Sequence, residues 1–402
     1  MTDFFERDDF SLVTLIIPQA KLSHCLTEIQ AHWPYNAIQF DCRGTLVREH
    51  RFQLFLPTIN PECEFLQFMV KDLDVTPFMG FCAEVNSLHL PGSGAIFSSK
   101  STSLTSNASA VADYCEHSRE QTAVDEQTNK SFKSNLYAVY ALIQSGRTEQ
   151  AIKAAMQAGS HGPIVYFVEG RGTRDRAGWL KITKKPYEEV VMVLVEDIDR
   201  QSVIEALVTA GRVDKLGGGV VFDMPVGQGL VNLPTSVGNR SQRSSNEQIT
   251  TAIDELMGGT DWRNRRTLEA LMASSESQGL QNHIGSKSVL LNAFLPRKYA
   301  NVFLEQVLIL GIPGANVTYA KRFSLSDDAN DLGVHIHHEL VQVRMVVPKE
   351  DSIGFSTALK QFVQEQEYDG VTIYEQELEQ VIRYQLKANN TTDKTQNYVA
   401  QE

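Results

Sequence analysis

The sequence contains no long hydrophobic run. Its longest apolar stretch, Val190 to Val195, is far shorter than the roughly 20 residues that cross a bilayer as a helix. The chain has 402 residues, of which 42% are hydrophobic and 21% charged, as is ordinary for a soluble globular protein. Its first residues are acidic where a signal peptide carries positive charge. We therefore expect a cytoplasmic protein that is not itself embedded in a membrane.

Cysteine and positive charge are also scarce. The 5 cysteines include no C-x-x-C pair, which argues against a disulfide framework. The 37 Lys and Arg against 49 Asp and Glu leave a net charge of −12, whereas a nucleic-acid partner needs a basic face. The sequence also lacks G-x-S-x-G, H-E-x-x-H and Walker A motifs. We expect no enzyme and no nucleic-acid partner, but a protein that binds another protein or a small molecule.

One arrangement occurs twice in the chain. Arg171-Gly172-Thr173 is followed by Gly217-Gly218-Gly219 and an apolar strand, and Arg43-Gly44-Thr45 is followed by Gly92-Ser93-Gly94 and another apolar strand. About fifty residues separate the two motifs in each copy, and Lys321-Arg322 stands at the corresponding place in the last third. An internal repeat of this kind predicts repeated structural units.

Hydrophobic periodicity predicts the same order of elements in each third of the chain. The middle third shows it most clearly, with strands at 136–143, 164–168, 189–195 and 220–224 and helices at 148–158 and 200–210. In the first third we predict strands at 12–17, 37–40, 52–56 and 95–97 and helices at 21–31 and 62–70. In the last third we predict strands at 289–295, 316–320, 340–347 and 371–374 and helices at 299–310 and 356–365.

This order is β-α-β-β-α-β, which is the ferredoxin-like order. The predicted fold class is therefore α+β, with tandem ferredoxin-like units. The predicted boundaries are a degenerate unit at 8–100, a polar linker at 101–131, a core unit at 132–233, a linker with a helical appendage at 234–285, a degenerate third unit at 286–387 and a disordered tail at 388–402.

The middle unit resembles the P-II signalling family and its P-II-like relatives. Val168-Glu169-Gly170-Arg171-Gly172-Thr173 is similar to the strand that enters that family's T-loop, and the segment from Gly211 to Phe222 is similar to its phosphate-cradling B-loop and the following strand. The resemblance covers about residues 134 to 233, is weak in the first unit, and in the third rests on element order alone. It implies ferredoxin-like units assembled as a trimer, with nucleotides in the clefts between neighbouring units. Two arrangements are open: an intramolecular pseudo-trimer, or a homotrimer of the middle units with the outer units as appendages.

The glycine cluster is the candidate binding site. Consecutive glycines let backbone N–H groups converge on a phosphate, and a neighbouring lysine adds positive charge. The residues assigned to this nucleotide or phosphate site are Gly170, Gly172, Lys215, Gly217, Gly218 and Gly219. The alternative is a glycine turn that only ends a helix and aims a strand. Val220 stands where ATP-binding members of the family carry a basic residue, so ADP, AMP and cyclic AMP are candidates beside ATP.

The segment between Arg171 and Tyr187 is basic on an otherwise acidic protein. Loops held by a rigid sheet commonly carry recognition. By resemblance this segment is a shortened T-loop that grips a protein target such as a membrane transporter or an enzyme. The residues assigned to this partner-binding loop are Arg174, Asp175, Arg176 and Lys181, and the alternative is a solvated loop without a partner.

The predicted function is that of a P-II-like regulator of nitrogen or inorganic-nutrient metabolism, which senses an adenine nucleotide or small anion and controls a target. Two other functions stay open. One is a scaffold that binds no ligand. The other is a metal-binding trimer of the ion-tolerance type, which would use His335, His337 and His338, although we assign no metal ligands because polar loop histidines are the more frequent case.

Overall fold

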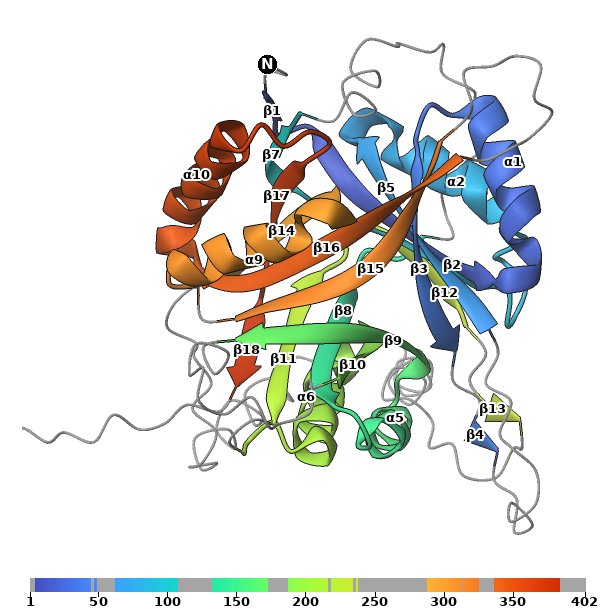
Figure 1. Ribbon diagram of the computed structural model, residues 1–402. Coiled ribbons are helices and arrows are strands. Elements are labelled where there is room, and N and C mark those ends of the chain that lie inside the picture. Colours follow the sequence, from blue (N-terminus) through green and yellow to red (C-terminus); the bar gives the residue numbers. More distant parts are fainter. Residues whose placement is uncertain are drawn as a thin grey trace, which may run out of the picture.

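The protein is described from a computed structural model of the chain, shown in Figure 1. The residues that this structure describes are 4–44, 47–48, 62–107, 132–172, 187–215, 218–233, 236–237, 288–312, 314–324 and 336–383. They form a mixed α and β protein built on one large sheet of 16 strands, and all strand pairings within this sheet are antiparallel.

The first third of the chain folds as strand, helix, strand, strand, helix, strand. Its elements are β2 (Phe10–Pro18), α1 (Leu22–His32), β3 (Ala37–Gly44), β5 (Glu62–Lys71), α2 (Val75–Val85) and β6 (Gly94–Lys100). The strands pair in the order β3-β5-β2-β6. The residues from β2 to β6 are called unit 1 below.

The prediction of a helix at 62–70 was wrong, because these residues form strand β5. Nearly every residue of β5 is buried, since core side chains cover both faces of the strand. A strand buried on both faces does not show the alternation of apolar and polar residues by which strands are recognised. The second helix of the unit begins only at Val75, and the strand predicted at 52–56 lies outside the described residues.

The middle third repeats this order, as predicted. Unit 2 consists of β8 (Leu136–Gln144), α5 (Thr148–Gln157), β9 (His161–Gly172), β10 (Tyr187–Glu196), α6 (Asp197–Gly211) and β11 (Gly219–Pro225). Its strands pair in the order β9-β10-β8-β11, which matches unit 1 position by position. Helix α6 ends where Arg212 adopts a left-handed conformation with φ of 54°.

The last third repeats the order again. Unit 3 consists of β14 (Ser288–Pro296), α9 (Ala300–Ile309), β15 (Gly314–Ser324), β16 (Ile336–Pro348), α10 (Lys349–Glu365) and β17 (Thr372–Glu377). The pairing order is β15-β16-β14-β17. Short 3-10 turns precede three of the helices, at Gln19–Lys21, Asp72–Asp74 and Arg297–Tyr299.

Each unit is followed by a short strand that pairs with a different unit. Strand β7 (Thr102–Ser106) pairs with β17 of unit 3, β12 (Gly229–Asn232) with β6 of unit 1, and β18 (Gln380–Arg383) with β11 of unit 2. Every unit therefore gives one strand to another unit and receives one. In addition, β1 (Phe5–Arg7) pairs with β7, and β4 (Val47–Arg48) pairs with β13 (Ser236–Val237) in parallel.

Strand β7 corrects the predicted domain boundary. The polar linker was predicted to begin at residue 101, but Thr102–Ser106 is part of the sheet and its Leu104 is fully buried. Its many Ser and Thr residues hide the strand in the sequence. In the structure Ser106 has a partner inside the protein, since its Oγ lies 2.8 Å from Thr372 Oγ1.

The second strands of the three units also pair with one another. The end of β3 pairs with the first half of β9 (Arg43 with Val165), the end of β9 with the start of β15 (Arg171 with Ala315), and the end of β15 with the start of β3 (Arg322 with Ile38). These three junctions form a closed ring. The sequence motifs Arg43-Gly44, Arg171-Gly172 and Lys321-Arg322 all lie at them.

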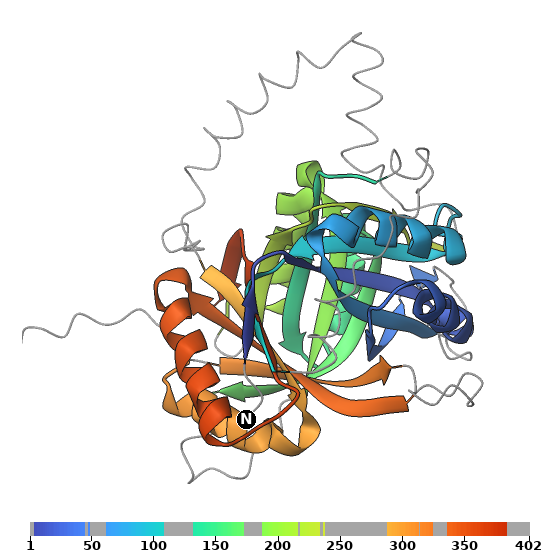
Figure 2. The ribbon, with the colours of Figure 1, turned by 90° about the horizontal axis from the view of Figure 1, so that it is seen from above.

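The helices lie outside and the strands inside. In Figures 1 and 2 the helix pairs α1 and α2, α5 and α6, and α9 and α10 stand at three separate corners around the strands. Each pair packs on its own unit, and together they enclose three separate apolar clusters. The opposite faces of the strands share one central core, to which all three units contribute. Most strands are thus covered on both faces.

Candidate functional site

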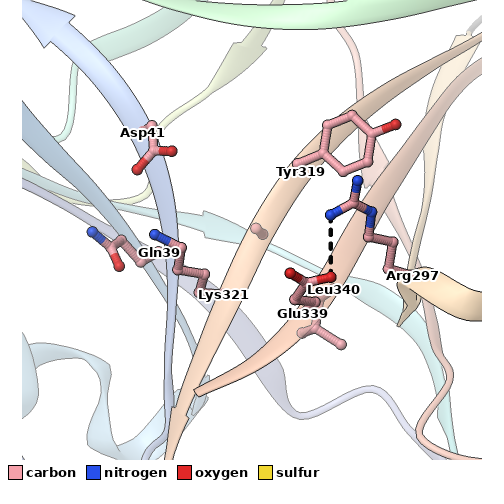
Figure 3. A pocket seen from close by; sticks show the side chains of 8 residues that line it. Gln39, Asp41, Arg297, Tyr319, Lys321, Glu339 and Leu340 are labelled. Atoms are coloured by element: carbon pink, nitrogen blue, oxygen red, sulfur yellow. Dashed lines mark hydrogen bonds and ion pairs between the residues drawn. The ribbon is translucent and has the colours of Figure 1, made fainter.

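A groove lies between units 1 and 3, where β15 pairs with β3 (Figure 3). Its narrow part encloses a cavity of about 80 Å³. Lys321 stands opposite Gln39 in the strand register, so the pairing of the two units creates this wall of the groove. The lining side chains come from β3, β15, β16 and the turn after β14, and they are Gln39, Asp41, Arg297, Tyr319, Ala320, Lys321, Glu339 and Leu340.

Arg297 is held across the groove by two contacts. Its Nη1 lies 3.1 Å from Glu339 Oε2, and its guanidinium lies 4.8 Å from the centre of the Tyr319 ring. Arg297 and Glu339 are both more than half exposed, so this ion pair contributes little to stability. An exposed pair of this kind can exchange partners with a charged ligand at small cost.

A wider cavity of about 460 Å³ continues from this groove along unit 3. It shares Arg297, Glu339 and Leu340 with the narrow part. Its further lining residues are Pro296, Lys298, Tyr299, Arg322, His338, Asp369 and Gly370. Tyr299 stacks on Tyr368 with ring centres 4.0 Å apart, and Lys298 Nζ lies 4.6 Å from the Tyr299 ring. The three cationic side chains outnumber the two carboxylates of the lining, Glu339 and Asp369, and with the aromatic wall they suit a small organic anion.

Beneath the narrow part lies a buried carboxyl group. Glu64 on β5 is 4% exposed and its Oε2 accepts a hydrogen bond of 2.5 Å from Gln39 Nε2. Burial raises the pKa of Glu64 and the neighbouring charge of Asp41 raises it further, whereas the hydrogen bond from Gln39 and the charge of Lys321 lower it by less. The carboxyl group beneath the groove therefore keeps its proton to a higher pH in the folded protein than in the unfolded chain.

This raised pKa predicts a pH effect on stability. Because folded Glu64 binds its proton more tightly than unfolded Glu64, its contribution to stability is present at low pH and is lost as pH rises from the ordinary carboxyl pKa through the raised value. We expect the unfolding free energy of Glu64→Gln to increase relative to that of wild type as pH rises from roughly pH 4 to pH 7. Urea denaturation measures both values. Glu62→Gln, an exposed change on the same strand, is the control and should follow wild type. Parallel curves for wild type and Glu64→Gln would contradict the assignment.

The glycines predicted to bind phosphate lie on unit 2, and the structure gives two of them a packing reason. A Cβ on Gly218 would stand 1.9 Å from the carbonyl oxygen of Arg212, and one on Gly219 1.9 Å from that of Leu142. The N–H of Gly218 donates to the carbonyl of Lys215 at 2.9 Å. A Cβ on Gly170 would stand 2.9 Å from the Glu188 side chain, whose flexible end can move aside, so packing does not require a glycine there.

The remaining predicted residues are placed as follows. Lys215 is exposed and lies 3.1 Å from Asp214 Oδ2, and Gly172 pairs with Gly314 at the junction of β9 and β15. Several predicted residues lie outside the described part of the chain: Gly217 and the loop residues Arg174, Asp175, Arg176 and Lys181. The phosphate site and the partner-binding loop stay predictions.

The histidine cluster is divided in the same way. His335 lies outside the described residues, whereas His338 lines the wider cavity. Among the described residues, no three His, Cys, Asp or Glu side chains are grouped as a metal site requires. Within the same part of the chain, no helix combines the length and the apolar character needed to cross a membrane.

Sequence reasoning missed the groove. Lys321-Arg322 was noted only as the third copy of the repeat, and Arg297-Lys298 carried no motif. The signal that could have found them is the position of Lys321-Arg322, because a basic pair replaces Arg-Gly in the third copy of the repeated motif. Its partners Gln39 and Asp41 are about 280 residues away, and only the pairing of β15 with β3 brings them together.

Comparison with known proteins assigns no family. No protein family and no curated protein match this chain. Among solved structures, an aspartate kinase from Synechocystis is similar with a TM-score of 0.18 and 10% identity, over 92% of this chain and 44% of the kinase. This chain thus spans less than half the length of that kinase.

Proposed function

We propose that this chain is a P-II-like regulatory protein in which one polypeptide supplies the three ferredoxin-like units that the family assembles from three subunits. The observation that supports this most is the cyclic exchange of strands. The strand that follows unit 1 pairs with unit 3, the strand that follows unit 3 pairs with unit 2, and the strand that follows unit 2 pairs with unit 1. In addition, the second strands of the three units form a closed ring. Such an arrangement is an intramolecular pseudo-trimer.

The ligand we propose is an adenine nucleotide or another small organic anion, bound where two units meet. Two boundaries offer the chemistry. On unit 3, beside its junction with unit 1, Arg297, Lys298 and Arg322 line the wider cavity. At the boundary of units 2 and 3, Gly170 pairs with Asn316. Lys215 lies elsewhere on unit 2, in the turn before β11 at the other edge of the sheet.

The output we propose is engagement of a protein target by the basic segment that follows Gly172. A ligand bound at a unit boundary would favour the conformation of this segment that docks on the target, because it binds that conformation more tightly. The target class is a transporter or an enzyme of nitrogen or inorganic-nutrient metabolism, reached in the cytoplasm.

Light scattering tests the pseudo-trimer. Since the chain pairs its own unit edges, we expect a solution mass of 44.9 kDa, that of one chain. A mass three times as large would show that the middle units assemble as an ordinary trimer and would sink the single-chain proposal. The result should not change between micromolar and higher protein concentrations.

Thermal unfolding with ATP, ADP, AMP and cyclic AMP tests the sensor. A ligand at 100 times its dissociation constant should add about 2.7 kcal/mol to the unfolding free energy. Lys215→Ala and Lys298→Ala then locate the site, because loss in only one variant assigns the ligand to the unit 2 turn or to the groove. If neither variant loses the response, ligand binding at these boundaries is refuted.

One observation favours a second function. The close approach of Gly218 and Gly219 to backbone carbonyls explains these glycines without a ligand. A scaffold that binds no nucleotide would show no thermal shift with any of the four compounds, and its protein partner would then bind equally well with and without them.

A further inference from the structure

The central core contains buried polar side chains among its apolar residues. Residues on β14, β16 and β17 alternate between the apolar cluster under the unit 3 helices and the centre of the molecule. The inward positions of unit 3 include four buried polar side chains: Asn292, Gln342, Arg344 and Gln376. Arg344 stands opposite Asn292 on the first strand of unit 3. At the same place in the other units, Gln67 stands opposite Thr14 in unit 1 and Met192 stands opposite Tyr140 in unit 2. Unit 3 therefore places a charge where unit 2 has a methionine.

Arg344 reaches across the centre to unit 2. It is 6% exposed, and its Nη1 donates a hydrogen bond to the hydroxyl of Tyr166. Its guanidinium lies 5.6 Å from the Tyr166 ring centre and 5.7 Å from that of Tyr140. Among the residues that the structure describes, no Asp or Glu pairs with it, and the side chains that act on its charge are Tyr166, Tyr140 and Tyr374.

The tyrosines cannot neutralise this charge. Burial raises the pKa of Tyr140, Tyr166 and Tyr374, so all three are uncharged at neutral pH. Ring faces attract a guanidinium, but burying a cation without a counter-charge still costs more than such contacts return. A buried positive charge of this kind calls for an anion.

Hydrogen bonding around Arg344 is also incomplete. Within the described residues, the Tyr140 hydroxyl has no hydrogen bond, and the guanidinium has only the one to Tyr166. Arg344 and Tyr140 keep 6% and 4% of their surface exposed, so neither residue is completely enclosed by protein atoms.

We propose that the centre of the molecule binds a small monovalent anion, a halide or a small carboxylate. The guanidinium of Arg344 supplies the charge and N–H donors, and the hydroxyl of Tyr140 supplies a second donor from another unit. The site joins units 2 and 3 through the anion. The anion site involves none of the groove residues, so its tests are independent of those of the proposed function.

Crystals soaked in bromide test the position of the anion. We expect an anomalous peak within hydrogen-bond distance of both the Arg344 guanidinium and the Tyr140 hydroxyl, and its displacement by formate would show that a carboxylate uses the same site. A centre with neither bromide nor formate would overturn the proposal.

Thermal unfolding in solution tests the same site without a crystal. Wild type should gain a saturable rise in melting temperature with bromide at constant ionic strength. Arg344→Met, which copies unit 2, should fold without halide and show no saturable rise, and Arg344→Gln, which copies unit 1, serves if the methionine variant does not fold. Tyr140→Phe should need about tenfold more bromide for half-saturation. An equal, saturable response in wild type and in the Arg344 variant would refute the assignment.

Discussion

Replacing Asp223 by alanine is expected to lower the unfolding free energy by about 3–5 kcal/mol. Asp223 on β11 is fully buried, and its Oδ2 accepts a hydrogen bond of 2.5 Å from Arg200 Nε. Its Oδ1 accepts a second one of 2.8 Å from the backbone N–H of Gln380, at the start of β18. The change would leave Arg200, which is 11% exposed, without its buried carboxylate partner and would weaken the pairing of β18, the strand that unit 3 lends to unit 2.

Urea denaturation measures this loss, and the chain offers a matched control. Asp197 also contacts Arg200, at 3.6 Å, but it is 65% exposed, so Asp197→Ala should change the unfolding free energy by less than about 1 kcal/mol. Burial raises the pKa of Asp223 despite the attraction of Arg200, which indicates that desolvation of the carboxylate outweighs that attraction. The double variant Asp223→Leu with Arg200→Met should therefore be more stable than Asp223→Ala alone. A double variant that is less stable than the single one would show that the charges themselves stabilise the fold.

Gly219→Ala is expected to cost about 2–5 kcal/mol of unfolding free energy. Gly219 has φ of 109°, which an alanine adopts only under strain, and the added Cβ would stand 1.9 Å from the carbonyl oxygen of Leu142. The strain falls on the pairing of β11 with β8, because Gly219 stands opposite Ile143 there.

Gly354→Ala is the control for this change. Gly354 lies in α10 with open space around it, so the same substitution should stabilise the helix by about 1 kcal/mol. Chemical denaturation without ligand separates the two explanations of the glycine cluster. If Gly219→Ala keeps its stability and loses only a nucleotide response, the glycine serves the ligand and the packing explanation is wrong.

Much of the secondary structure could be predicted, because helices packed on one side of a sheet keep their 3.6-residue pattern. Helices α5, α6, α9 and α10 all contain their predicted ranges or most of them. Strand β5 was not predicted because it is buried on both faces. Strand β7 was not predicted because its Ser and Thr residues are typical of a polar linker. In both cases what makes the segment a strand is its pairing with a partner strand, which the segment's own sequence does not show.

The candidate sites divide in the same way. The glycine run could be recognised in the sequence because a close approach of two backbone segments requires glycine at that position. The groove residues Arg297 and Lys321 were not, since their role depends on a neighbour contributed by another unit. Arg344 lies within a predicted strand, but nothing local tells that its face points to a shared centre and not to a helix.

By itself, the sequence determined the order of elements in each third and the places where the chain turns, because periodicity, helix stops and glycine conformations act over a few residues. The tertiary structure alone decided which unit receives β7, β12 and β18, where the groove lies, and that one arginine faces two tyrosines of another unit. These features arise from hydrogen bonds and burial between segments far apart in the chain. No local pattern encodes them, because their free energy is gained only when the three units close on one another.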